Sequence, residues 1–524
     1  MKTSRQTLVV VIVIALILNF GVAFTLGVNR PMESDSFYFL CIAKSLATGH
    51  GYMLTEGFWP DVPTMSRAPG WPFVVSLALR MAPGVNPDVV MRLLSCTLNA
   101  IAAVLVAMLA GRVIRYSLFV IGGGKRVKSY GLSVIRNTKN EQPITNNSAE
   151  GSPNNLSAIA GCIYAAYPVA LYEAYEGTSE ILFIVLALIG TLLIISAKAP
   201  IVSNWRRWLG FLVMGCAVLV RPNFITWIGF VGLLVIGYWL SVRLSPSPFR
   251  GEGWGEGAPK PANTPHPNPL PQGEREKDLA LLPLPSGERV GVRVSSPLLS
   301  RPWMARVRGS LTRLFKLKLF SFAFCMTLFL VPSFFWAIRN YHVCGHFPVL
   351  STLRGQTFYG GNNSVVANTL DLWGYWVFPN SIPGERPMYE LSHTMSEQEV
   401  DVYYFDKGKA WVKSHWSEMP RLVLGKLVRA YVPIPWKPSL KSWFVAAWRW
   451  GIYVAGIAGI LLTWRRWPFS LKLIFSAMVL SNVMTVVFFW GCARFAFELD
   501  PFLIPFAVLA VLCQMEKARL APEQ

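Results

Sequence analysis

Two short clusters of charged and aromatic residues carry most of the chemistry that this sequence offers. The first, Glu33 to Tyr38, holds two carboxylates and follows closely after an apolar stretch over 8–28; the second, Arg67 to Pro72, holds a cation and precedes the next apolar stretch. Charged groups placed just outside a membrane could act on a lipid-borne substrate, with a carboxylate as base and the cation binding an anion. An ordinary polar loop would use the same residues, so the rest of the chain must decide.

Transfer of a sugar from a lipid phosphate to a hydroxyl or amine would need both kinds of group. A base takes the acceptor proton while the anomeric carbon loses its phosphate, and Asp or Glu is the natural base. Arg or Lys stabilises the charge that develops on the leaving phosphate. Asp35 or Glu33 could supply the base, and four cations are expected at or near the outer ends of apolar stretches: Arg67, Arg221, Arg339 and Arg494.

These arginines and a later acidic group each have a second interpretation. A single Arg at a helix end is more often an interfacial anchor, but four on the face that also carries the acidic loop favour a site. Glu173, Glu176 and Glu180 could form a solvated acidic rim. Of the three we expect only Glu180 to face protein or a cavity, because it begins an apolar helix.

The elements that must position these residues are membrane helices. Of the 524 residues, 53% are hydrophobic and only 15% are charged, and the mean hydropathy is +0.40. Such a composition indicates a polytopic membrane protein. The net charge of +21 would suggest a nucleic-acid partner in a soluble protein. Here Lys and Arg concentrate between apolar stretches, as membrane topology requires, so we expect no nucleic-acid partner.

A membrane helix needs about 20 mostly apolar residues. On that basis the sequence predicts about ten spans: 8–28, 93–112, 156–172, 180–197, 207–220, 223–242, 318–338, 443–464, 471–490 and 501–515. The first is too long for a typical signal peptide and is expected to be an uncleaved anchor. With an inner N-terminus, the strong basic clusters all fall on the inner side, as the positive-inside rule predicts: Arg115 to Lys128, Arg206 and Arg207, Arg306 to Lys318, Arg465 and Arg466, and Lys517 and Arg519.

The predicted fold is an all-α polytopic membrane protein in three parts. An N-terminal membrane module, 1–242, contains the first outer segment, 29–92, and a C-terminal module, 316–524, contains a larger outer segment, 339–442. Within the outer segments we expect an amphipathic stretch over 71–79 and a helix opening at Ser396. The part between the modules, 243–315, is rich in Pro and Gly, repeats one short motif, and is expected to be a disordered cytoplasmic insertion.

Metal and redox chemistry have little support in the sequence. The eight Cys are scattered without a CxxC pair. His342 and His346 have ligand-like spacing, but Gly345 and the nearby Pro348 oppose the helix that would align them. We therefore predict neither a metal site nor a cofactor.

The order of several short motifs resembles that of a known enzyme family. The first outer segment carries Asp35, then Ala43, Leu46, Gly49, the pair Gly51-Tyr52, and Arg67 to Pro72; similar matches follow around Glu180, in 218–222, 336–341, 361–363 and 410–420, and at Arg494 before Pro501. This series resembles the GT-C membrane glycosyltransferases, in particular the protein O-mannosyltransferase-like and lipid A aminoarabinose transferase-like enzymes (bacterial glycosyltransferase family 39-like). The resemblance covers nearly the whole chain except 114–155 and 243–315.

The resemblance implies a GT-C-like fold of about ten transmembrane helices with outer juxtamembrane helices. It implies a polyprenyl-phosphate sugar donor, a lipid, glycan or protein acceptor, and a site on the outer face of the bacterial plasma membrane. It places the general base at Asp35. Because Ser36 and Phe39 depart from the residues often found there, Glu33 stays an alternative base. The substrate-binding residues that it suggests are Arg67, Glu180, Arg221, Arg339, Asn340, Asn362 and Arg494.

Two other kinds of membrane protein remain as alternatives. A transporter of lipid-linked sugars would have similar topology but should show paired broken spans with charges near the middle of the bilayer. A polysaccharide polymerase or ligase with a large outer loop would not need the early Asp35 cluster.

Overall fold

The computed structural model describes residues 4–121, 153–196, 205–244, 301–345 and 350–520. The chain divides into two compact units, residues 1–236 with 320–524, and residues 237–319. The first unit holds every element discussed below as part of the site. Most of the predicted insertion, 243–315, and the predicted inner residues Lys125, Arg126 and Lys128 lie outside the described residues, as does His346.

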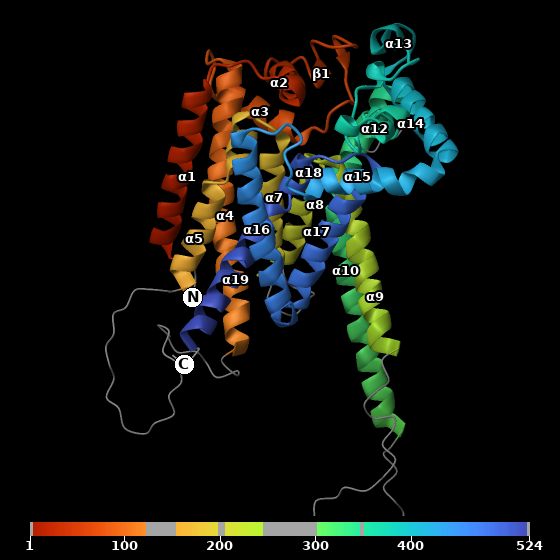
Figure 1. Cartoon of the computed structure of the whole chain (residues 1–524). Helices are drawn as coiled ribbons and strands as arrows, with labels where there is room; N and C mark the ends of the chain where they lie inside the picture. The colour runs from red at the N-terminus through yellow and green to blue at the C-terminus, as the bar shows by residue number, and fades with distance from the viewer. Residues whose placement is uncertain (1–3, 122–152, 197–204, 245–300, 346–349, 521–524) are drawn as a thin grey trace, which may run out of the picture. The chain divides into compact units, whose positions relative to one another are not determined.

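Helices occur at each of the ten predicted spans (Figure 1). Their bounds are α1 (Arg5–Leu26), α4 (Pro87–Ile121), α5 (Pro153–Ala165), α6 (Pro168–Tyr175), α7 (Ser179–Ile195), α8 (Trp205–Val218), α9 (Thr226–Leu244, after the short helix η2, Pro222–Ile225), α10 (Arg301–Cys344), α16 (Leu440–Thr463), α17 (Phe469–Phe488) and α19 (Asp500–Leu520).

The number of full spans is lower than predicted. Within the described residues, six helices are long and apolar enough to cross a membrane, and a seventh span results if the bent pair α5 and α6 is counted as one. That pair bends by 52°, where Pro168 begins α6. The helices α7 and α8 have only 17 and 14 residues, fewer than the roughly 20 that a span needs. The chain is nevertheless a multi-pass α-helical membrane protein.

Small residues allow the N-terminal helices of the bundle to approach closely. A Cβ atom on Gly161 of α5 would lie 2.8 Å from Val11 Cγ1 of α1 and 3.0 Å from the Ala103 carbonyl oxygen of α4. The small side chains Ala15, Ala103 and Ala107 are likewise fully buried. Packing of this kind replaces the hydrophobic driving force that lipid cannot supply between membrane helices.

The first outer segment folds into short elements at one end of the bundle (Figure 1). It contains α2 (Ser34–Ala47), an antiparallel pair of strands β1 (Met53–Leu54) and β2 (Val62–Pro63) with Met53 opposite Pro63, and α3 (Gly70–Met81). The predicted amphipathic stretch 71–79 lies within α3. Trp71 of α3 is fully buried, and its Nε1 donates to the Gly177 carbonyl oxygen at 2.9 Å, which fixes α3 on the bundle.

The second outer segment is built from short helices. These are α11 (Arg354–Gly360), α12 (Ser364–Asn368), η3 (Leu370–Leu372), η4 (Pro379–Ser381), α13 (Met388–Thr394), α14 (Glu397–Ser414), η5 (Trp416–Glu418) and α15 (Met419–Tyr431); the turn η6 (Trp464–Arg466) and α18 (Ala493–Phe497) complete the described elements. The helix predicted to open at Ser396 is confirmed: Ser396 and Glu399 form a capping box at the start of α14.

The two outer segments bind each other directly. The Glu397 carboxylate accepts hydrogen bonds from the Thr64 hydroxyl at 3.0 Å and from the Met65 amide at 3.2 Å. Arg339, near the end of α10, donates to the carbonyl oxygens of Thr64 at 2.8 Å and Tyr52 at 3.2 Å. The chain that leads to Arg67 is therefore held from both sides.

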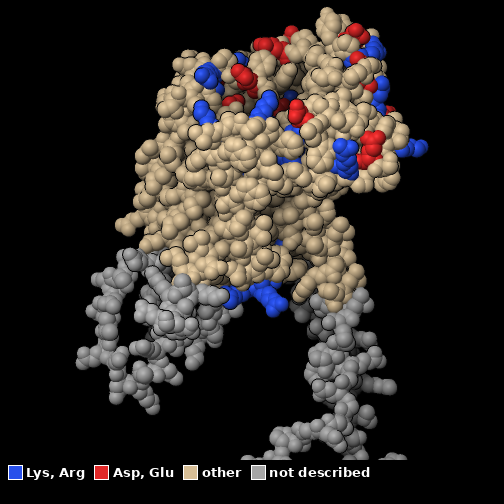
Figure 2. All heavy atoms as spheres, viewed as in Figure 1, with Lys and Arg blue, Asp and Glu red and all other residues tan. Residues whose placement is uncertain are grey.

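The distribution of charge predicts the membrane orientation. Among the described residues on the face in Figure 2, Lys and Arg alone occur at the lower end, and both signs of charge occur at the upper end. A reporter fused after Pro259 should therefore be cytoplasmic, and one fused near Ser396 should be exterior. Protease protection or a compartment-specific enzyme reporter would measure this. Finding both fusions on the same side would contradict the orientation.

Candidate active site

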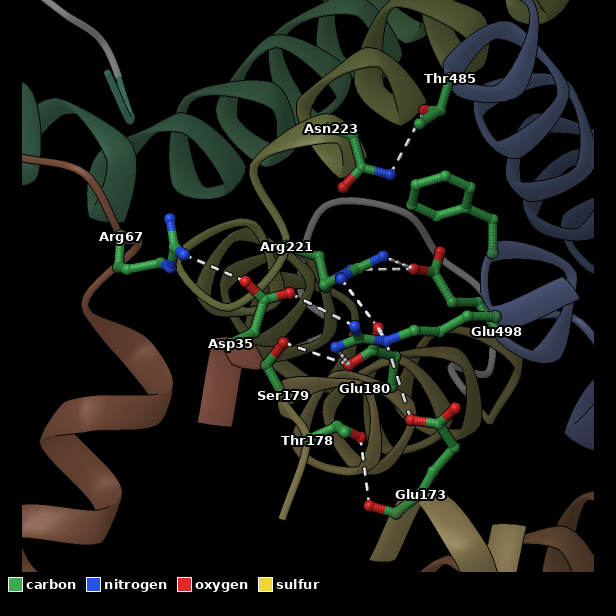
Figure 3. A network of polar contacts seen from close by, with 12 residues as sticks. Asp35, Arg67, Glu173, Thr178, Ser179, Glu180, Arg221, Asn223, Thr485 and Glu498 are labelled. Carbon is green, nitrogen blue, oxygen red and sulfur yellow. Dashed lines mark hydrogen bonds and ion pairs between the residues drawn. The ribbon is translucent and has the colours of Figure 1, made fainter. Parts of the chain in front are cut away.

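Five of the predicted site residues meet in one network of ion pairs and hydrogen bonds (Figure 3). They come from four parts of the sequence that are far apart. The first outer segment supplies two of them, Asp35 at the start of α2 and Arg67 before α3. The others are Glu180 in the first turn of α7, Arg221 between α8 and η2, and Arg494 in α18.

Asp35 is the most accessible carboxylate of the network. One of its oxygens lies 3.0 Å from Arg67 Nη2 and the other lies 3.3 Å from Arg494 Nη1. About 45% of the side chain is exposed, so a ligand could reach the carboxylate without unfolding the site. The preceding Ser34 has a φ of 53°, a left-handed conformation that costs roughly 1–2 kcal/mol outside glycine. Strained backbone of this kind is often found beside functional groups.

The surrounding charges keep Asp35 ionised. Its partial removal from water raises the pKa of the Asp35 carboxyl, but the positive charges of Arg67, Arg494 and Arg221 outweigh that effect. The pKa of Asp35 is therefore lower than usual.

Glu180 is the buried centre of the network. Its side chain is fully buried, and its two oxygens lie 2.9 Å from Arg221 Nη1 and 2.9 Å from Arg494 Nη2. Arg494 also forms an ion pair with Glu180 through Nε. Because each arginine holds the same carboxylate, Glu180 fixes the position of the guanidinium that reaches Asp35.

Two further carboxylates complete the network. Arg221 Nη2 lies 2.8 Å from Glu498, and Arg494 Nε lies 3.7 Å from Glu173. Burial would lower the pKa of Arg494, but the carboxylates of Glu180, Glu173 and Asp35 raise it well above its usual value. The guanidinium thus stays charged. Burial raises the pKa of Glu498, against the opposing effect of Arg221.

The network continues into the second outer segment. Asn482 of α17 donates to Glu498 at 3.2 Å and accepts a hydrogen bond from the Tyr431 hydroxyl of α15 at 2.6 Å. A chain of polar contacts therefore connects α15 through Glu498 and Arg221 to Glu180.

Sequence reasoning missed part of this site. Glu498 was not singled out, although it follows Arg494 by four residues, a spacing that brings side chains together on a helix. Glu173, treated above as a possible solvated rim, is buried and faces Arg494. The available signal was that Glu173 lies within a mostly apolar stretch, 169–175, where a lone carboxylate is expected to have a buried partner.

Four predicted residues lie outside the network. Glu33 is exposed at the N-cap position of α2 and does not cap the helix. Arg339 binds the backbone at 52 and 64 and donates to the buried Asn340 Oδ1 at 3.1 Å. Asn362 is buried, donates to the Phe488 carbonyl oxygen at 3.1 Å, and accepts from Lys426 Nζ at 2.7 Å. Arg339, Asn340 and Asn362 thus hold outer segments in place.

No group of three or more His, Cys, Asp or Glu side chains suited to a metal ion occurs among the described residues. The carboxylates of the network are instead paired with arginines.

Comparison with known proteins gives only distant likenesses. No family model matches the chain, and no curated protein matches it. Among solved structures, ArnT from Cupriavidus metallidurans bound to undecaprenyl phosphate is similar at 13% identity, with a TM-score of 0.36 over 99% of this chain and 80% of that one. The apo state of the same protein is similar at 12% identity, with a TM-score of 0.31 over 98% and 81%. Values this low do not assign a family, so the function rests on the site itself.

Proposed function

We propose that this protein is an integral membrane glycosyltransferase of the GT-C type. It would move a sugar from a polyprenyl-phosphate donor to a lipid, glycan or protein acceptor at the outer face of a bacterial plasma membrane. The observation that carries the proposal is the accessible Asp35 carboxylate held between Arg67 and Arg494. A base and two phosphate-binding cations at one end of a membrane bundle suit this chemistry.

The reaction assigns a role to each accessible group. Asp35 accepts the proton of the acceptor hydroxyl or amine as the acceptor atom bonds to the anomeric carbon. The bond from that carbon to the phosphate oxygen breaks, and the polyprenyl phosphate leaves with the electron pair. Arg67 and Arg494 stabilise the charge that develops on it. Attack opposite the leaving group inverts the anomeric carbon.

Donor binding would also raise the pKa of Asp35. While Arg67 and Arg494 pair with Asp35, its lowered pKa makes it a weak base. A bound phosphate competes for the same guanidinium groups and would release part of that electrostatic stabilisation. The pKa of Asp35 then rises towards its ordinary value, which favours proton transfer.

The buried residues act on this site through Arg494 and Arg221. Glu180, Glu173 and Glu498 fix the two guanidinium groups, which keeps Arg494 within reach of both Asp35 and a donor phosphate. Glu33 is a weaker candidate for the base, because it is exposed and the arginines of the network pair with Asp35 instead.

A transporter fits these observations less well. Such proteins use paired broken helices with charges near the bilayer midplane. The described residues contain one bent pair, α5 with α6, and the network gathers residues from helix ends and outer loops.

The proposal is tested with purified protein and a panel of radiolabelled polyprenyl-phosphate sugars. We expect one or a few donors to release their lipid phosphate in the presence of a membrane extract that supplies acceptors. Protein with Asp35→Asn, prepared in the same way, is the control for contaminating enzymes. Failure of every donor in the panel would contradict a transferase that uses polyprenyl-phosphate sugars.

A further inference from the structure

A second pocket lies in the second outer segment, apart from the Asp35 network. It has a volume of about 340 Å³ and is formed by α11, α12, α14 and the chain after η4. This volume falls in the range of roughly 300–1,000 Å³ that small-molecule sites occupy. None of its lining residues belongs to the network around Asp35. The pocket therefore needs an explanation other than proton or phosphate chemistry.

An immobilised tryptophan forms one wall of the pocket. Trp411 Nε1 donates to the Ser364 hydroxyl at 2.9 Å, and the indole stacks on His415 with 4.7 Å between ring centroids and 12° between planes. The Trp411 side chain also packs against the small apolar cluster of Val366, Ala367 and Leu422. Because the side chain is fixed by these contacts, a ligand would lose little free energy in ordering it.

The rest of the lining is neutral and mixed in polarity. Ile382 is one of three apolar side chains, Tyr359 adds a second aromatic ring, and Ser364 adds a hydroxyl. The buried Asn363 amide is already used in hydrogen bonds to the backbone of residues 359, 360, 365 and 366. The Tyr359 hydroxyl donates to Glu385 at 2.7 Å, so its oxygen still has a free lone pair. The Ser364 hydroxyl accepts from Trp411 and can still donate its proton.

These features select among ligand classes. A phosphate or carboxylate would find no cation in the lining, since the nearby Lys407 is paired with Glu385 at 3.1 Å. An acyl chain would leave the polar groups of Ser364 and Tyr359 unmatched. A pyranose ring has both an apolar C–H face, which packs on aromatic rings, and hydroxyls, which pair with single donors and acceptors.

We infer that this pocket binds a neutral sugar ring. The inference deepens the proposed function, because such a ring would belong to an acceptor glycan held at a distance from the reacting atoms. The pocket then contributes to acceptor affinity and leaves the chemical step to Asp35.

The test uses full-length protein in nanodiscs and measures binding by saturation-transfer NMR. The probes are the methyl glycosides of glucose, mannose, galactose and N-acetylglucosamine, with glucose 1-phosphate as the charged comparison. We expect at least one neutral glycoside to bind saturably and more tightly than the phosphate. Trp411→Ala should weaken that binding by about tenfold or more, which corresponds to about 1.4 kcal/mol. Trp411→Phe, which keeps a ring, should lose less.

A matched control is available close by. Trp416 is 72% exposed and does not line the pocket, so Trp416→Ala should leave glycoside binding unchanged. If Trp411→Ala does not fold, Ser364→Ala, which removes only a hydroxyl, should still weaken binding several-fold. Absence of saturable binding by all four glycosides, or equal binding in folded pocket variants and native protein, would overturn the inference.

The same samples separate this inference from the proposed function. Asp35→Asn should keep glycoside binding and lose transfer. Glycoside binding that depends on Trp411, in a native protein without transfer activity, would leave the pocket standing and contradict the transferase. Transfer that depends on Asp35, without any glycoside binding, would support the transferase and contradict the sugar-binding pocket.

Discussion

Replacing Asp35 with Asn should lower sugar transfer by roughly 10²–10⁴-fold, the usual loss when a general base is removed. The amide keeps the shape of the side chain but cannot accept the acceptor proton. Asn also cannot form ion pairs with Arg67 and Arg494, so both cations become more available to the donor phosphate. Donor binding should therefore stay near normal or tighten while turnover falls. Single-turnover transfer and a separate donor-binding assay measure the two effects.

Two matched variants make this result specific. Glu33→Gln changes the exposed carboxylate two residues away and should have little effect. Arg67→Ala should chiefly weaken donor binding, because its proposed partner is the lipid phosphate. If Glu33→Gln abolished turnover and Asp35→Asn did not, the base would be Glu33. Near-normal activity in both Asp35→Asn and Glu33→Gln would show that neither carboxylate of the first outer segment is the base.

The pH dependence follows from the same contacts. The lowered pKa keeps Asp35 ionised in the free protein to a lower pH than an ordinary aspartate. Loss of kcat/KM on acidification should therefore begin at a lower pH than an unperturbed Asp would give. Since the bound phosphate competes for the arginines, the acid limb of kcat should lie at a higher pH than that of kcat/KM.

Of these replacements, Arg494→Ala should lower the free energy of unfolding the most. It leaves the fully buried Glu180 with one cation instead of two, and truncating one partner of a buried ion pair typically costs about 3–5 kcal/mol. We expect the lower end of that range, because Arg221 still pairs with Glu180 and about 26% of the Arg494 side chain is exposed. Thermal unfolding in detergent measures the loss. Transfer should also fall, since Arg494 is proposed to bind the phosphate.

A double replacement separates the two roles of Arg494. Arg494→Gln combined with Glu180→Gln removes both charges and should recover part of the stability that either single change loses. It should not recover transfer, because no guanidinium remains beside Asp35. Arg386→Ala is the surface control: its pair with Glu390 is 48% and 57% exposed, so its loss should cost at most about 1 kcal/mol. Unchanged stability in Arg494→Ala would show that the buried network does not hold the fold.

The sequence alone located the membrane helices and the segments between them. The spans predicted over 443–464 and 471–490 correspond closely to α16, Leu440–Thr463, and α17, Phe469–Phe488. The capping residues at Ser396 likewise placed the start of α14. These features are local, since the length of an apolar run and the side chain at a helix end act on neighbouring backbone. The predicted number of full spans was too high, because short apolar helices such as α7 resemble spans in the sequence.

Only the tertiary structure decided which charged residues meet. Arg221, Arg339 and Arg494 look alike in the sequence, since each lies at or near the end of a helix. Packing brings Arg494 to Asp35 across 459 residues and Arg221 to Glu498 across 277, but places Arg339 on the backbone near Tyr52. A helix end favours a cation whether it faces lipid headgroups or a carboxylate, so local sequence cannot distinguish the two. The choice depends on how the helices pack, and that packing assembles Asp35, Glu180 and Arg494 into one site.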